Sequence, residues 1–157
     1  MKNPLTWNQP LGRPECPYAH RWMLNLGRFG SVRLHRWHRS DDKRAKHDHP
    51  SDFVTLVLKG SYTDLGRRGS CLTCNLKQPD CPDCHFTEEM RPGSIRRRSA
   101  EHVHTVDVHP GGCWTLLYFW PERRTWGFWV PGSNGRIKFK AARRYFASQG
   151  HHPCDQD

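Results

Sequence analysis

Short apolar stretches, separated by glycine and proline turns, recur at even spacing along this chain. The stretches that we expect to form strands are Arg21–Arg28, Ser31–His38, Phe53–Lys59, Ser61–Asp64, His85–Met90, Ser94–Arg98, His102–His109, Cys113–Trp120 and Thr125–Val130. Turns are expected at Gly60, Pro92-Gly93 and Gly111-Gly112. Many short strands with turn signals between them predict an all-β sandwich or barrel, and a jelly roll is one way such a chain protects its edges.

The two ends of the chain differ from this pattern. Met1–Tyr18 contains four prolines and is predicted to be an irregular lead-in. Ala141–Gln149 has helical spacing, and residues 151–157 are predicted to form a loose tail. The length of 157 residues suits a single domain over 1–157, and seven Trp and seven Phe supply apolar surface for its core.

The start of the chain is short, polar and without the apolar stretch of an export signal. No run approaches the roughly 20 apolar residues of a membrane span. We therefore expect a cytoplasmic protein with no membrane partner. In that compartment the seven cysteines, an odd number, are expected to be reduced thiols or metal ligands rather than disulfides.

The formal net charge is +10, and the basic residues cluster at Arg33–Lys46, Arg91–Arg98 and Arg136–Arg144. One interpretation is an ordinary solvated surface. The other is attraction to an anionic partner, either nucleic acid or an acidic small molecule. No recognised nucleic-acid motif accompanies the charge, so both interpretations stay open.

Histidines occur as two His-x-His pairs, each next to an apolar stretch. Side chains of a strand alternate between its faces, so His47 and His49 share a face, as do His102 and His104. Along continuous strands these faces continue into Phe53, Thr55 and Val57 and into Val106 and Val108. Two strands that each run from imidazole to apolar side chains predict a metal site at the mouth of a small barrel.

These histidines carry a resemblance to the cupin superfamily. The first motif of that family is His-x-His, three or four residues, Glu, six residues and Gly, and here His47, His49 and Gly60 fit its frame with Phe53 at the Glu position. Asp41 stands where the family has a preceding Gly. The second motif has a His ten residues after a Pro-Gly turn, which selects His104 after Gly93, with His102 in reserve.

The similarity is greatest to small single-domain cupins of bacteriophage and bacterial genomes, and it covers roughly Arg21 to Pro131. It implies a cupin jelly-roll barrel with one divalent transition metal, Fe, Zn, Mn or Ni, and it allows a homodimer because cupins often pair through strands. Three neutral imidazoles leave coordination positions open, which is typical of a catalytic metal site. Asp52 is a candidate fourth ligand whose parity opposes that of His49, and Asp48 is expected to point away from the metal.

A cysteine-rich insertion over residues 66–86 contains two Cys-x-x-Cys pairs. Four thiolates at Cys71, Cys74, Cys81 and Cys84 are typical of a structural zinc site, in which His85 could replace one cysteine. Redox or disulfide pairing is the alternative. The segment has few apolar residues, so a metal is expected to give it a fixed, zinc-knuckle-like shape.

Two functions follow from these motifs. The first is a metal-dependent cupin enzyme, dioxygenase-like, that acts on a small anionic substrate at the three-His site. Arg96, Arg98 and Tyr62 are its candidate substrate-binding residues. The alternative is a non-catalytic module that binds nucleic acid or protein through its basic surface and the four-cysteine knuckle. The second hypothesis predicts binding that weakens steeply with salt.

Overall fold

The computed structural model describes residues 3–13, 16–41, 45–67, 85–131 and 137–148. Its elements are β1 (Leu5–Arg13), β2 (Cys16–Asn25), η1 (Gly27–Phe29), β3 (Ser31–Trp37), β4 (Lys46–His47), β5 (Phe53–Arg67), β6 (His85–Met90), β7 (Ile95–Arg98), β8 (Val103–Phe119), β9 (Gly127–Pro131), β10 (Ile137–Ala141) and α1 (Ala142–Ala147). The prediction of an all-β fold with a short C-terminal helix is confirmed. None of the described helices is long and apolar enough to cross a membrane.

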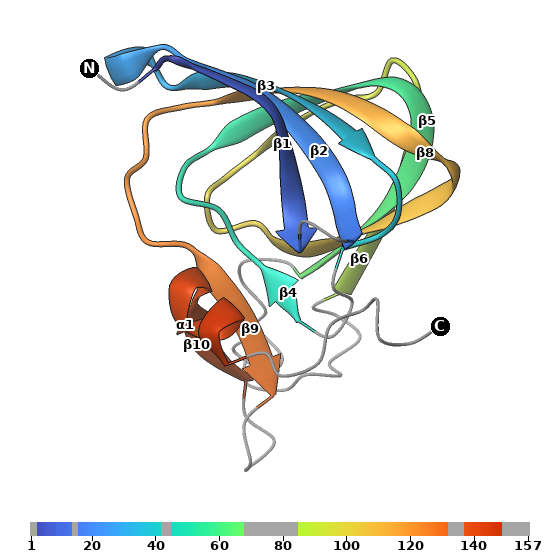
Figure 1. Cartoon of the computed structure of the whole chain (residues 1–157). Coiled ribbons are helices and arrows are strands. Elements are labelled where there is room, and N and C mark those ends of the chain that lie inside the picture. The colour runs from blue at the N-terminus through green and yellow to red at the C-terminus, as the bar shows by residue number, and fades with distance from the viewer. Residues whose placement is uncertain (1–2, 14–15, 42–44, 68–84, 132–136, 149–157) are drawn as a thin grey trace.

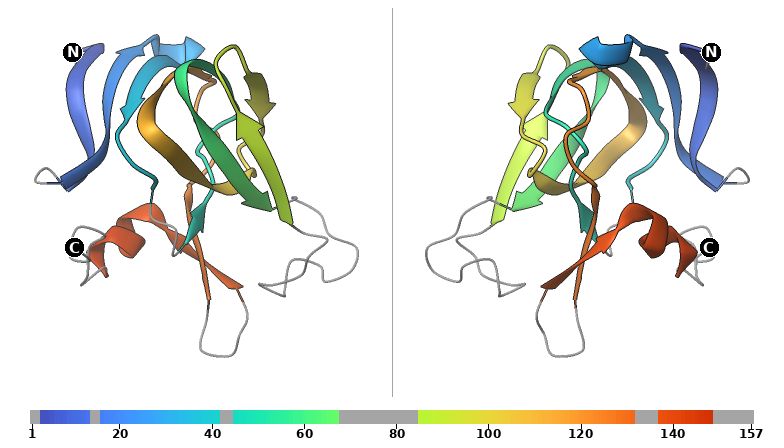
Figure 2. Two further views of the ribbon diagram at one scale, coloured as in Figure 1. Left: turned by 90° about the vertical axis from the view of Figure 1, so that its right-hand side faces the viewer. Right: turned by 90° about the vertical axis from the view of Figure 1, so that its left-hand side faces the viewer.

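The strands form one sheet that curls into a half-barrel around a hollow (Figure 1). The sheet runs β1-β2-β3-β8-β4-β9-β10, and β5 pairs with β6, β7 and β8. The long strands β5 and β8 pair antiparallel from Phe53–Phe119 to Arg67–Val103. Strand β3 joins the second half of β8, whereas β4 pairs with its first half at His104. Figure 2 shows how both long strands bend from one side of the hollow to the other.

Glycines in the middle of β5 and β8 make this bend. Gly60 has a φ of 71° and Gly112 a φ of 77°, and the register shifts between Gly60 and Tyr62. Before Gly60 the buried positions of β5 are Phe53, Thr55 and Val57, and after it they are Tyr62, Asp64 and Gly66. The extra residue of a bulge reverses which parity faces the core. The sequence prediction of turns at Gly60 and Gly111-Gly112 is therefore wrong, because both strands continue through these glycines.

The predicted irregular lead-in is also wrong. Residues Leu5–Arg13 and Cys16–Asn25 pair as β1 and β2, with shifts in register that accommodate prolines at the edge of the sheet. Strand β10, which lies within the basic cluster Arg136–Arg144, pairs with β9 from Ile137–Pro131 to Ala141–Gly127. Helix α1 then packs on β9, where the rings of Tyr145 and Phe128 stack at 3.8 Å.

We expect Gly60→Ala to lower the free energy of unfolding by about 3 kcal/mol. Its Cβ would lie 1.9 Å from the carbonyl oxygen of Gly112, in a backbone conformation that L residues disfavour. Gly93→Ala is the matched control, since Gly93 also has a positive φ but has nothing within 4 Å of an added Cβ. Urea denaturation of both variants measures the difference. Equal losses of stability would contradict the close approach of the Gly60 and Gly112 backbones.

Candidate metal centre

Two short segments and one long strand position three imidazoles. His47 lies in β4, where it pairs with His104 of β8 and Phe128 of β9. His49 follows two residues later, and its backbone N–H donates to the carbonyl of Ala100 at 3.0 Å. The pairing of β4 with β8 thus brings together residues more than 50 positions apart in the sequence.

Asp48, between the two histidines, holds this segment in place. Its carboxylate is fully buried and accepts hydrogen bonds from Gly127 N at 2.7 Å, Arg124 Nη1 at 2.9 Å and Trp129 Nε1 at 3.1 Å. These three donors turn Asp48 away from the hollow, as expected from its parity. His47 and His49 consequently project together toward His104.

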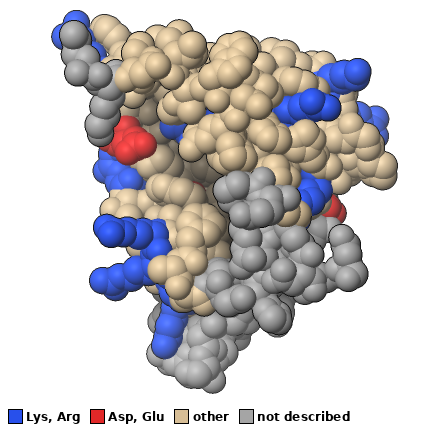
Figure 3. All heavy atoms as spheres, in the orientation of Figure 1, with Lys and Arg blue, Asp and Glu red and all other residues tan. Residues whose placement is uncertain are grey.

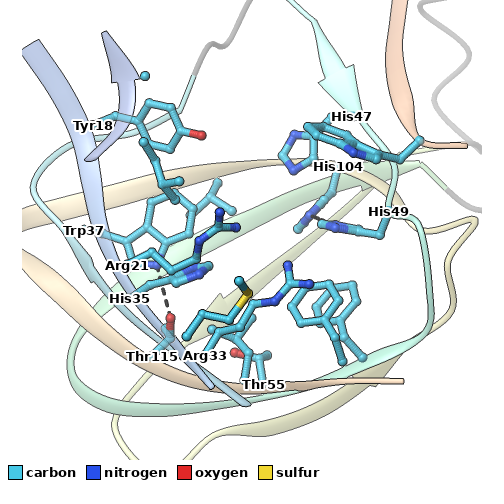
Figure 4. A pocket seen from close by; sticks show the side chains of 18 of the residues that line it. Tyr18, Arg21, Arg33, His35, Trp37, His47, His49, Thr55, His104 and Thr115 are labelled. Atoms are coloured by element: carbon cyan, nitrogen blue, oxygen red, sulfur yellow. Dashed lines mark hydrogen bonds between the residues drawn. The ribbon is translucent and has the colours of Figure 1, made fainter. Parts of the chain in front are cut away.

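The three imidazoles converge on one point (Figure 4). His49 Nε2 lies 2.8 Å from His104 Nε2. The ring centre of His47 lies 4.8 Å from that of His104 and 5.1 Å from that of His49. One nitrogen of each residue lies within 4.8 Å of the other two, so the three could hold a metal ion. The structure therefore brings together the three histidines that the motif spacing selected.

Buried carboxylates stand behind two of the rings. The Nδ1–H of His104 donates to Asp64 Oδ1 at 2.8 Å, and His47 Nδ1 lies 3.5 Å from Asp41 Oδ2. A carboxylate on Nδ1 fixes the ring and leaves the Nε2 lone pair free for a metal. The donor set and its supports therefore fit a divalent transition metal.

Burial also disfavours protonation of His47 and His49. Burial lowers the pKa of His47 and of His49 well below its usual value, and the neighbouring His104 lowers both further. Both rings are thus neutral at neutral pH, which is the form that binds metals. For Asp64, burial raises the pKa, but hydrogen bonds from His102 and His104 outweigh it and keep the carboxyl ionised.

His102 lies next to the three ligands but is held differently. Its Nε2 is 3.1 Å from Asp64 Oδ2, and Arg98 Nη2 donates to the same oxygen at 3.0 Å. Asp64, His102 and His104 form a second group with metal-ligand geometry. This group is already joined by its own hydrogen bonds, and of its members His104 alone lines the cavity described below. His47, His49 and His104 are therefore the better metal site.

No carboxylate of the described residues takes the place of the cupin glutamate. Phe53, at that position, lies against His49 with ring centres 4.4 Å apart and stacks on Phe119. The carboxylate of Asp52 instead accepts from the backbone N–H of Ala100 at 2.9 Å and from Arg123 at 2.8 Å. Asp52 thus anchors the segment around Ala100 rather than approaching the imidazoles.

The Nε2 atoms face a cavity of about 790 Å³ inside the curled sheet. Aromatic and apolar residues cover much of its wall, and 26 residues line it in all. Tyr62, one of the predicted substrate-binding residues, is among them, and burial raises the pKa of its hydroxyl above the usual value. A cavity of this size suits a small molecule.

The predicted arginines lie elsewhere. Arg96 is exposed and pairs with Glu88, and Arg98 bridges Glu88 and Asp64. Neither residue lines the cavity. The four predicted zinc ligands, Cys71, Cys74, Cys81 and Cys84, lie outside the described residues, as does residue range 68–84 of the insertion. Residues Gly66–Arg67 and His85–Phe86 at its ends pair as parts of β5 and β6.

Sequence reasoning missed five polar residues around the hollow, Arg21, Arg33, His35, Asp41 and Asp64. Alternation along Ser31–Trp37 was visible, but a row of polar side chains normally marks the solvent face of a strand. Asp64 was missed because the bulge at Gly60 reverses its parity.

Cys16 is disulfide-bonded, which contradicts the expectation of reduced thiols at that position.

No protein-family model and no curated protein matches the sequence. Among solved structures, Fe(II)-HppE with the alternative substrate (S)-1-HPP matches with a TM-score of 0.53 and 10% identity, over 76% of this chain and 56% of that one. A cupin superfamily protein from Desulfitobacterium hafniense matches with a TM-score of 0.49 and 12% identity, over 76% and 97% of the two chains. The chain thus spans little more than half the length of HppE, and at this level of identity the likeness to HppE concerns the fold alone.

Proposed function

We propose that this protein is a metal-dependent enzyme that holds one divalent transition metal at His47, His49 and His104 and acts on a small anionic substrate. The observation that carries the proposal is the convergence of three imidazoles on the wall of a cavity of about 790 Å³. A structural metal site is normally closed by four protein ligands, whereas three ligands facing a cavity leave positions for a substrate.

A metal at this site supplies a Lewis-acid centre and, if it is iron, the capacity for one-electron chemistry. Asp64 and Asp41 orient the ligand rings, which keeps their free nitrogens aimed into the cavity. Phe53 and Phe119 cover one side of the imidazoles and exclude water from it. The neutral hydroxyl of Tyr62 lies on the cavity wall, hydrogen-bonded with Thr55, where a substrate would contact it.

The comparison with HppE supports iron as the first metal to test, since that protein holds Fe(II) together with a substrate in the same fold. Zn, Mn and Ni remain the other candidates, because imidazole ligands do not select strongly among these ions. Similarity at this level concerns the fold, so the reaction of HppE is not transferred to this chain.

Elemental analysis tests the site itself. We expect protein purified without oxygen to retain a metal that His47→Ala loses and Cys71→Ala keeps. A zinc ion at the four cysteines, which stays a prediction, would be lost in Cys71→Ala and kept in His47→Ala. If His47→Ala and wild type carry identical metals in identical amounts, the three-His site is not a metal centre.

Catalysis is tested separately with the iron-loaded protein. We expect oxygen uptake with at least one member of a panel of small carboxylates, phosphonates and thiols, and we expect His49→Ala to abolish it. Phe139→Ala is a suitable control, because Phe139 lies exposed on β10 and does not line the cavity. A metal-loaded protein that turns over none of the panel with Fe, Zn, Mn or Ni would count against an enzyme.

The alternative function rests on the surface charge. Basic side chains gather along the edge formed by β10 and α1, whose sequence includes Lys138, Lys140, Arg143 and Arg144 (Figure 3). Few acidic side chains lie on that face. Binding of nucleic acid there would retard DNA or RNA in a gel-shift assay, and the retardation would decrease as the salt concentration increases.

A further inference from the structure

The cavity has a second polar region, on strands β2 and β3, away from the three imidazoles. Arg21 pairs directly with His35 across these strands, and Arg33 lies two residues before His35 on the same face. All three side chains line the cavity (Figure 4). Neighbouring positions of this inner face carry hydroxyls, since Thr115 pairs with His35 and Thr55 with Leu117.

His35 has unused hydrogen-bonding capacity at this position. Its side chain is 7% exposed, and neither Nδ1 nor Nε2 has a hydrogen-bond partner. Burial, together with the charges of Arg21 and Arg33, lowers the pKa of His35 to about 3, so the ring is neutral. A buried imidazole without a partner is costly, because its polar atoms have lost water and gained nothing in return.

The two guanidinium groups are held in place by neutral groups. Arg21 donates to Gln9 Oε1 at 2.6 Å through Nη2, and Arg33 Nε donates to Ser31 Oγ at 3.0 Å. Neither arginine forms an ion pair with a carboxylate of the described residues, although exposed Glu122 also lines the cavity. Burial lowers the pKa of Arg33 to about 10, which still leaves it charged at neutral pH. Exposed Glu122 is close enough for its charge to raise the pKa of Arg33, but neither arginine is paired with a carboxylate of the described residues, so this part of the cavity keeps an excess of positive charge.

Phe119 connects this region to the metal site. Arg33 Cζ lies 3.9 Å from the Phe119 ring centre, and the His49 ring centre lies 5.9 Å from it. Phe53 stacks on Phe119 and extends the same apolar floor under His49. A small molecule lying across these rings would reach the arginine at one end and the imidazoles at the other.

We propose that Arg21, Arg33 and His35 form an anion subsite that binds the acidic group of the substrate. Two guanidinium groups and one imidazole N–H match the oxygens of a carboxylate or a phosphoryl-type group, which then neutralises the charge of the two arginines. The substrate class is therefore a small molecule with an anionic group at one end and a metal-binding group at the other. The second half of this description rests on the proposed function, whereas the anion subsite does not require a metal.

Titration of metal-free protein with inorganic phosphate and, separately, with acetate tests the subsite. We expect calorimetry to detect binding of at least one of these anions, with a dissociation constant in the ~mM range or tighter. Arg33→Gln is expected to weaken binding about 10- to 100-fold. Arg36→Gln is the matched control, because Arg36 lies on the same strand but faces outward over Trp114. It should bind like wild type.

Arg33→Lys guards against a folding defect, since it keeps the charge and loses the planar fork. We expect it to fold, as judged by circular dichroism, and to bind the anion more weakly than wild type. In ¹⁵N-labelled wild type, the NMR chemical shifts of the His35 ring nitrogens should change as the anion is added. Binding of neither anion by the metal-free wild type, or equal affinity in Arg33→Gln and wild type, would overturn the subsite. Neither result depends on whether His47→Ala loses its metal.

Discussion

His104→Ala should weaken metal binding by more than about 100-fold, whereas His102→Ala should leave it within a few-fold of wild type. Removing His104 deletes the nitrogen that lies 2.8 Å from His49 Nε2, at the centre of the converging ligands. Removing His102 deletes a ring whose Nε2 is already engaged with Asp64. Titration of metal-free protein with Co(II), followed by its visible absorption, measures both affinities.

The pair is well matched as a control. Both histidines belong to the same stretch of sequence, contact the same carboxylate and lie with ring centres 4.6 Å apart. A general disturbance of the fold by a missing imidazole would therefore affect both variants. If His102→Ala instead loses the metal and His104→Ala retains it, the ion sits in the group of Asp64 and His102 and the site described here is wrong.

The sequence singled out the three histidines that the structure brings together, but not the residues around them. His47, His49 and His104 were found because period-two alternation and the distance from Gly93 are local properties of the chain. The same local logic failed at Asp64, since one added residue at Gly60 exchanges the two faces of β5. It also failed for β1 and β2, because prolines at a sheet edge look like a loop when pairing is unknown.

The polar residues of the cavity were missed because alternation along β3 is compatible with a polar face that is either exposed or enclosed. Alternation along β3 separates Arg33 and His35 from Val32 and Leu34, but it does not say which face is enclosed. In an ordinary β-sandwich the polar face of each sheet is exposed to solvent. Here the sheet curls around the polar face, so Arg33 and His35 lie inside. That outcome depends on the bends of β5 and β8, which are far away in the sequence.

Asp64→Asn should both destabilise the protein and weaken its metal site. The carboxylate is 2% exposed and accepts from Arg98, His102 and His104, so its neutralisation leaves a buried guanidinium with less compensation. We expect a loss of about 3 kcal/mol in the free energy of unfolding and a 10- to 100-fold loss in metal affinity. Urea denaturation of metal-free protein and Co(II) titration measure the two effects.

Glu88→Gln separates these two roles of Asp64. Glu88 is the other carboxylate that pairs with Arg98, but it has no hydrogen bond to either histidine. We expect Glu88→Gln to lower stability by less, about 1 kcal/mol, because its side chain is 26% exposed and solvent screens the pair. Its metal affinity should equal that of wild type. Arg98 needs a carboxylate for stability, whereas His104 needs the carboxylate of Asp64 to hold its Nε2 toward the metal. An equal loss of metal affinity in both variants would show that Asp64 acts through the charge of Arg98 and not through the imidazole.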